Sequence, residues 1–237
     1  MRIPTDSIRD FPPLTCSELL RLSEVHQAND AALYKQTCDW IHGFLAKPHR
    51  DRGIHGAVCP FVPEAIRQDT LWLASVRGVP DGVEQMVKIV WLYANLYLQL
   101  PSADEESAIL NAILIIFPDI PLEQAPRLID ETQRQLKPDV VERGKMIGEF
   151  HRLNLRSGLH NLHFHPLQSP IPLLAIRAMV ESDLPFLMRP SDPPLARARC
   201  LRAYLRLLHK ELSPARVEQA RKALDEAQAE LQEAEAR

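Results

Sequence analysis

The sequence predicts an α+β fold, a small mixed β-sheet of about four strands covered by helices, with helical extensions at both ends. Two observations support this class. Short apolar segments rich in β-branched residues alternate with amphipathic helical segments. Twenty prolines against eight glycines also divide the chain into short elements. We therefore expect three parts: residues 1–48 as an N-terminal helical segment, residues 49–190 as the α+β core with the candidate site, and residues 191–237 as C-terminal helices.

The N-terminal segment is expected to hold two helices. Thr15 and Glu18 have the spacing of a capping box, which predicts a first helix that ends near His26. Asn29 is a suitable N-cap for the second helix. This helix has an apolar stripe at three-and-four spacing and ends before Pro48. The stripe consists of Leu33, Tyr34, Cys38, Ile41 and Leu45.

The core is expected to alternate strands and helices. Strands are predicted at residues 70–76, 145–150 and 173–179. Helices are predicted at residues 63–67, 81–99 with Asp81 as cap, 121–136 and 139–143. A capping-box pattern at Ser102 and Glu105 precedes residues 109–117, which are expected to be a helix that merges into a buried strand. These elements explain the predicted mixed sheet.

Two helices are expected after Pro193 and Pro194, at residues 195–212 and from residue 214 onwards. The final helix carries a narrow heptad seam that would pack on the body of the protein or on another subunit, which makes a homodimer through the C-terminal helices an open alternative. The preceding helix has basic residues along one face, at Arg199, Arg202, Arg206 and Lys210. A solvated surface explains these charges, and a contact to an acidic helix or ligand is the alternative.

Composition excludes several classes of protein. The formal net charge of −3 gives no reason to expect binding to nucleic acid or to an anionic membrane. No apolar run is long enough to span a membrane, and residues 1–15 lack the order of a signal peptide, so a cytoplasmic location is expected. The four cysteines have no paired CxxC spacing and are expected to be free thiols.

The chemistry is expected in residues 148–170, which contain four of the nine histidines. These are His151, His160, His163 and His165, and they lie among asparagine, serine and glycine residues that favour turns and offer polar groups. The apolar segment that follows contains Arg177, whose buried guanidinium would need an anionic partner.

Other motifs leave several kinds of site open. His160, His163 and His165 have the spacing HxxHxH, which suits a mononuclear metal site. The loop 49–58 is a second candidate segment and leads to Cys59 and Pro60, where a thiol held outside regular structure would suit haem iron. A buried structural cysteine explains the same pair. The chain has no GxSxG, GxGxxG or GxxxxGK[ST] motif, so hydrolase, dinucleotide and P-loop sites are not supported.

Several blocks of the sequence resemble a bacterial domain family of unknown function that is associated with natural-product gene clusters. The blocks are GAVCPFVPEAI, KMIGEFH, GLHN and HPLQSPIPLLAIRAMVESDLPFL, and they cover roughly residues 56–187. The order of a cysteine-proline block and a later GEF strand with a basic loop is also similar to the YqcI/YcgG family. That family usually has Pro-Cys where this chain has Cys59-Pro60, and an arginine-rich loop where this chain has histidines.

The second resemblance implies a haem-dependent oxygenase that oxidises the amine nitrogen of an amino acid or similar metabolite, with O2 and an electron donor as partners. His151 or Cys59 would be the axial ligand of the iron, with His163 and Arg156 as further cofactor contacts. Glu149, His160 and His165 would serve in catalysis, Glu149 by accepting the substrate ammonium. Arg177 and Asn161 would contact the substrate. Two alternatives stay open: a non-catalytic haem-binding, metabolite-binding or partner-docking protein, and a non-haem metal enzyme that uses the histidine loop.

Overall fold

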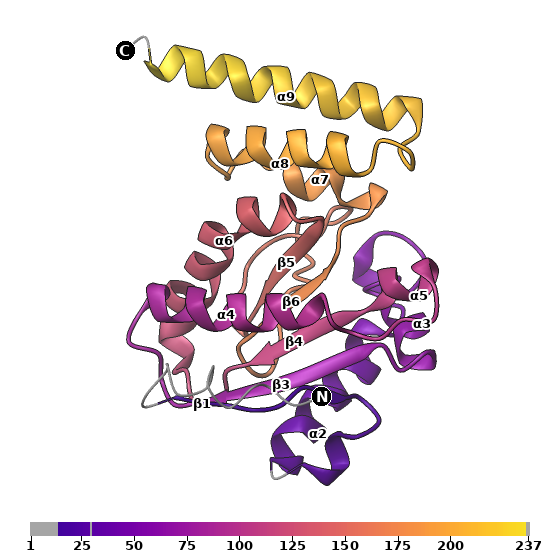
Figure 1. Cartoon of the computed structure of the whole chain (residues 1–237), viewed down its shortest axis with the longest axis vertical. Coiled ribbons are helices and arrows are strands. Elements are labelled where there is room, and N and C mark those ends of the chain that lie inside the picture. Colours follow the sequence, from indigo (N-terminus) through magenta and orange to yellow (C-terminus); the bar gives the residue numbers. More distant parts are fainter. Residues whose placement is uncertain (1–13, 29, 236–237) are drawn as a thin grey trace. The chain divides into compact units, whose positions relative to one another are not determined.

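Figure 1 shows the chain as a computed structural model in which residues 14–28 and 30–235 are described. The chain divides into two units, one within residues 1–133 and 148–177 and the other within residues 134–147 and 178–237. The expected N-cap Asn29 lies outside the described residues. No helix in the described ranges is both long and apolar enough to cross a membrane.

The α+β class is confirmed, and the described strands form one mixed sheet. Its order is β1-β3-β4-β6-β5, and β2 pairs with β3 as well, so the sheet has six strands rather than about four. β3 and β4 are parallel, whereas β4 and β6 are antiparallel. The strands are β1 (Thr15–Cys16), β2 (Leu20–Arg21), β3 (Leu71–Arg77), β4 (Ala112–Ile116), β5 (Lys145–Phe150) and β6 (Leu173–Ala178).

The prediction of a helix from Thr15 to His26 is wrong. This segment forms β1 and β2, which pair antiparallel with β3, and then a short 3-10 turn, η1 (Val25–Gln27). Leu19, between the two strands, is fully buried. The free edge of β3 needs hydrogen-bond partners, and pairing it outweighs the local capping-box signal.

The second helix is confirmed as α2 (Ala31–Trp40), continued by the π-turn η2 (Ile41–Leu45). Two expected caps are wrong. The N-cap of helix α4 (Val83–Tyr97) is Gly82, which makes no side-chain hydrogen bond, instead of Asp81. The N-cap of helix α5 (Glu105–Leu110) is Asp104, which accepts from Ser107 N at 2.8 Å, instead of Ser102. The boundary between α5 and β4 falls at Asn111.

Several of the remaining helices begin at a proline. Pro63, Pro126 and Pro194 each lie in the first turn of a helix, where the missing N–H costs nothing. The α-helices are α3 (Val62–Arg67), α4 (Val83–Tyr97), α5 (Glu105–Leu110), α6 (Glu131–Val141), α7 (Leu184–Leu187), α8 (Pro194–Leu207) and α9 (Pro214–Glu235). The shorter turns are η3 (Arg50–Arg52), η4 (Leu122–Gln124), η5 (Pro126–Asp130) and η6 (Glu181–Asp183).

In the first unit the sheet buries both faces, because α2 and α4 pack on opposite sides of β3 and β4 (Figure 1). Leu71 and Leu73 of β3 belong to the same core cluster as Tyr34 of α2. The alternate residues Trp72 and Ala74 are also buried and point to the other face. Strands buried on both sides are almost continuously apolar, and this pattern predicted β3. For β4 the same pattern predicted a helix merging into a buried strand within residues 109–117, without the boundary between them.

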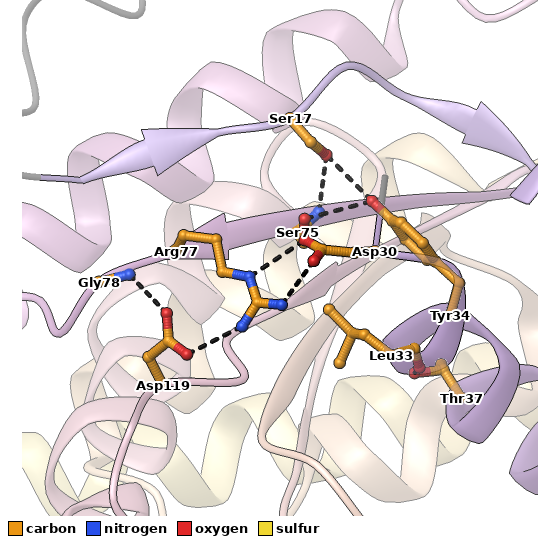
Figure 2. Close-up of polar contacts among 9 residues, drawn as sticks. All are labelled: Ser17, Asp30, Leu33, Tyr34, Thr37, Ser75, Arg77, Gly78 and Asp119. Carbon is orange, nitrogen blue, oxygen red and sulfur yellow. Dashed lines mark hydrogen bonds and ion pairs between the residues drawn. The ribbon is translucent and has the colours of Figure 1, made fainter. Parts of the chain in front are cut away.

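Arg77, the last residue of β3, holds three segments together (Figure 2). Its Nε lies 3.0 Å from Asp30 Oδ2, just before α2, and its Nη1 lies 2.9 Å from Asp119 Oδ1, after β4. Asp119 also accepts from Gly78 N at 2.8 Å. The Arg77 guanidinium lowers the pKa of the Asp30 carboxyl. Both carboxylates neutralise Arg77, so this cluster fixes the end of the parallel pair.

The second unit has its own apolar core, to which α7, α8 and α9 all contribute. Ala220 and Ala227 of the expected heptad seam of α9 are buried within the chain, as is Ala223 beside them, whereas the seam residue Ala234 is exposed. Lys137 is buried and donates to Phe186 O at 2.7 Å and to Asp192. All four cysteines are free thiols, as expected.

Candidate active site

The two candidate segments, loop 49–58 and loop 151–172, lie against each other. Asn161 Nδ2 donates to Asp51 O at 2.8 Å, and the His49 ring stacks on Phe164 with 4.9 Å between centroids. Gly53 has a φ of +85°, and a Cβ at this position would lie 2.8 Å from His160 O. The close approach therefore requires glycine.

The tip of the longer loop, residues 157–164, is folded on itself by its own hydrogen bonds. Ser157 Oγ donates to Leu162 O at 2.8 Å, and Gly158 N donates to Phe164 O at 2.7 Å. The Asn161 side chain accepts from His163 N at 2.9 Å, so Asn161 ties the tip together as well as joining it to loop 49–58. Phe164 is buried beneath the tip.

His151 stands at the end of β5 and is fully buried. Its Nε2 lies 2.9 Å from Oδ1 of Asp130, the last residue of η5. Its Nδ1 is buried and has no hydrogen-bond partner among the described residues. A histidine with one nitrogen held by a carboxylate and the other nitrogen vacant is arranged for proton transfer or for ligation.

Glu149 and Arg156 form an ion pair beside His151. Glu149 is buried, and its Oε1 lies 2.6 Å from Arg156 Nε. Asn154 supports both partners, because its Nδ2 donates to Glu149 O at 3.2 Å and its Oδ1 accepts from Arg156 N at 2.9 Å. We expected Glu149 and Arg156 to bind separate ligand groups, and the structure pairs them with each other.

The other three histidines of the loop do not share a common point. His160 and His163 are exposed, whereas His165 is half-buried with its Nδ1 covered and without a hydrogen-bond partner in the described chain. Among the residues that the structure describes, no three His, Cys, Asp or Glu side chains are grouped so that they could hold a metal ion. The HxxHxH spacing therefore does not assemble the expected three-histidine metal site.

Cys59 lies half-buried in a turn held by the main chain. Its N donates to Leu45 O at 3.0 Å, and its O accepts from Val62 N at 3.3 Å. Arg177 of β6 is close to the same turn, with its guanidinium carbon 5.8 Å from the centroid of the Phe61 ring. The structure thus brings Arg177 to the Cys59 segment.

Sequence reasoning missed two features of this site. Asp130 was not identified, because nothing in its local pattern marks it and it is 21 residues from His151. The large exposed side chains of the loop were also missed, although leucines outside any helical or strand period are the signal. Leu153, Leu155, Leu159 and Leu162 have exposed fractions of 45 %, 72 %, 49 % and 75 %.

A family model described as a domain of unknown function (DUF6875) matches residues 34–232. This range covers β3 to β6, both loops and most of α9, and it leaves out β1 and β2. The comparison with curated proteins and the comparison with solved structures gave no match.

Proposed function

This chain belongs to the DUF6875 family, and we propose that it is an enzyme for a small metabolite in which the His151 imidazole is the reactive group. One observation carries the proposal: His151 is fully buried, Asp130 occupies its Nε2 at 2.9 Å, and its Nδ1 has no partner among the described residues. Buried polar nitrogens are almost always satisfied in proteins, so one without a protein partner calls for a ligand.

The Asp130 carboxylate sets which nitrogen carries the proton. An ionised carboxylate only accepts hydrogen bonds, so His151 donates its Nε2–H and keeps the lone pair on Nδ1. A histidine that acts as a general base needs one ring nitrogen that is oriented by a carboxylate and a second ring nitrogen that is free to take a proton. Because Nδ1 is buried, a substrate can reach it only if a neighbouring segment moves, and we propose that residues 152–170, which follow His151 directly, move aside to admit it.

The Glu149–Arg156 pair suggests the substrate class. Glu149 and His151 are two residues apart at the end of β5, the spacing that places side chains on one side of a strand. A zwitterionic amino acid offers an ammonium for Glu149 and a carboxylate for Arg156, so it replaces one ion pair by two. We therefore propose an amino acid or a similar amine-bearing acid as substrate.

The proposal is tested by metabolite depletion. The purified chain is incubated with a mixture of amino acids and with a small-molecule extract, and mass spectrometry follows what is consumed. We expect the wild type to consume at least one amine-bearing acid, His151→Gln to lose that activity, and His209→Gln, an exposed histidine of the second unit, to retain it. The same consumption by His151→Gln and wild type, or no consumption by either, would overturn the proposal.

A second candidate is the haem-dependent oxidation of an amine nitrogen. His151 fits an axial role poorly, because Asp130 occupies Nε2 and the free Nδ1 adjoins the ring carbon that carries the side chain, which would crowd a porphyrin. Cys59 fits better, since its thiol is half-buried in a fixed turn and Arg177 lies near by for a carboxylate. Haem would supply the activation of O2 with an electron donor. For this candidate function we also propose a role in secondary metabolism and a cytoplasmic location.

Titration with haemin tests the second candidate. If it holds, the wild type develops a Soret band at one equivalent, Cys59→Ser shifts or loses it, and Cys38→Ser, also half-buried, keeps it. Loss of the band in His151→Ala instead would assign the axial position to His151. A protein that does not alter the haemin spectrum at all would remove haem from the proposal.

A further inference from the structure

An open groove lies along α8 and α9, within the second unit. It is a hollow of about 450 Å³, and its lining consists of basic and apolar side chains only: Arg202, Leu205, Arg206, His209, Val217, Arg221 and Leu224. The three apolar residues are half-buried, and the four basic residues are exposed. A groove of this kind fits an amphipathic partner that carries negative charge.

Charge is segregated along α9 itself. Its first half carries the exposed Arg221 and Lys222, and its second half carries exposed Asp225, Glu226 and Glu233. None of these five side chains has an ion pair with another residue in the described chain. The first half of the helix is therefore mainly basic, with Glu218 as an acidic exception, and the second half is acidic. Glu230 of the second half pairs with Arg197, whereas the five charges named above have no ion pair in the described chain.

We propose that the groove binds α9 of a second copy of this chain in antiparallel orientation. A two-fold axis across the helix places the basic half of each copy against the acidic half of the other, so both sets of charges are matched at once. A parallel pair would place like charges side by side. Leu205, Val217 and Leu224 supply the apolar contact, because the buried alanines of α9 are already used against the rest of the unit.

The acidic complement is present in the chain itself, which favours a second copy over a small anion. The groove is also open along the helices, as suits a helix rather than an enclosed ligand. The heptad pattern predicted a homodimer through the C-terminal helices. In the arrangement proposed here, this dimer forms by charge pairing across the exposed faces of the helices instead of by packing of an alanine seam. This inference does not depend on the proposed activity.

Charge reversal tests the pairing by sedimentation of the full-length chain. One variant is Arg221→Glu with Lys222→Glu, and the other is Asp225→Lys with Glu226→Lys. Each makes α9 repel a copy of itself, so we expect the dissociation constant of the homodimer to rise at least tenfold. Mixing the two variants should restore a dimer, because an acidic α9 then faces a basic one. All four positions are exposed, so circular dichroism should show unchanged helix content.

The control is Lys47→Glu with Lys88→Glu, exposed residues of the first unit that change the net charge by the same amount as the first variant. It should dimerise like the wild type. A wild type that is monomeric at all concentrations, or variants that dimerise alone but not better when mixed, would overturn the proposal. If the chain is monomeric and octanoate shifts the NMR signals of Arg202 and Arg221, the groove belongs to an amphipathic anion instead.

Discussion

The buried charged side chains of this protein are held by specific partners. Lys137 pairs with Asp192, and Glu149 pairs with Arg156. His151 differs from them, because only one of its two ring nitrogens has a partner among the described residues. A charged group that is buried without a partner costs several kcal/mol. The partners therefore determine how the protein responds to substitution and to pH.

Lys137→Met should destabilise the protein strongly. It leaves Asp192 buried without its cation, which typically costs about 3–5 kcal/mol. Urea unfolding of the variant and the wild type measures the difference. Lys35→Met removes an exposed ion pair to Asp39 and should leave the midpoint unchanged. Equal midpoints for wild type and Lys137→Met would contradict the buried pair.

The Arg77 cluster should make part of the stability depend on pH. Because Arg77 lowers the pKa of Asp30 below the ordinary value of 3.8, the pair stabilises the folded state above that pH and loses its contribution as pH falls through the lower folded-state value. Both side chains are partly exposed, so the contribution should stay below about 1 kcal/mol. Arg77→Met should thus have a lower urea midpoint than wild type at pH 7 and the same midpoint well below pH 3.8. A constant difference at all pH values would contradict this assignment.

Single residues of the site could be predicted only in part. His151 was predicted to be functional because it lies in the histidine-rich segment at the end of an apolar strand, and Glu149 and Arg156 were assigned roles only by the family resemblance. Their pairing was not predicted, since Glu149–Arg156 and Asp130–His151 depend on how the loop folds back. The paired loops around Asn161 and Asp51 are likewise joined across 110 residues.

At the scale of elements, two strands could be predicted almost to the residue, as β5 and β6 show. The error at β1 and β2 has a clear cause. Their residues have a helix-like local pattern, and they become strands only because the edge of β3 is available to them. A local pattern does not reveal a free strand edge 50 or more residues away along the chain.

Gly53→Ala should separate the two loops of the candidate site. The new Cβ would lie 2.8 Å from His160 O on a backbone with φ of +85°, so one loop must shift. We expect faster proteolysis within residues 151–172 and a loss of stability of about 1 kcal/mol or more. Gly43→Ala, where a Cβ meets nothing within 4 Å, is the matched control and should behave like wild type. Equal proteolysis of both variants would contradict the loop contact.

The whole molecule has a separate apolar core in each of its two units. Each unit also contains a deeply buried cysteine, Cys16 in the first and Cys200 in the second, and burial raises the pKa of both thiols to about 11. The sequence indicated a helical C-terminal part, but the second unit also contains residues 134–147. Residues 134–147 join the C-terminal helices through contacts between distant parts of the chain, which the periodicity of the sequence does not predict.

Thiol labelling should follow this burial. At pH 8 we expect iodoacetamide to modify half-buried Cys59 first and then Cys38, because burial raises the pKa of the Cys38 thiol. Cys16 and Cys200 should react only after unfolding. Mass spectrometry of the digested protein gives the order. Labelling of Cys16 or Cys200 in the native protein as fast as that of Cys59 would contradict the two buried cores.

The central claim is that His151 keeps an available lone pair on Nδ1, and nitrogen NMR of the imidazole rings tests it most directly. For wild-type protein near neutral pH we predict a protonated Nε2 and an unprotonated Nδ1 at His151, and a shift of proton occupancy toward Nδ1 in Asp130→Asn, where an amide replaces the accepting carboxylate. A wild-type His151 that carries its proton on Nδ1 would contradict the account.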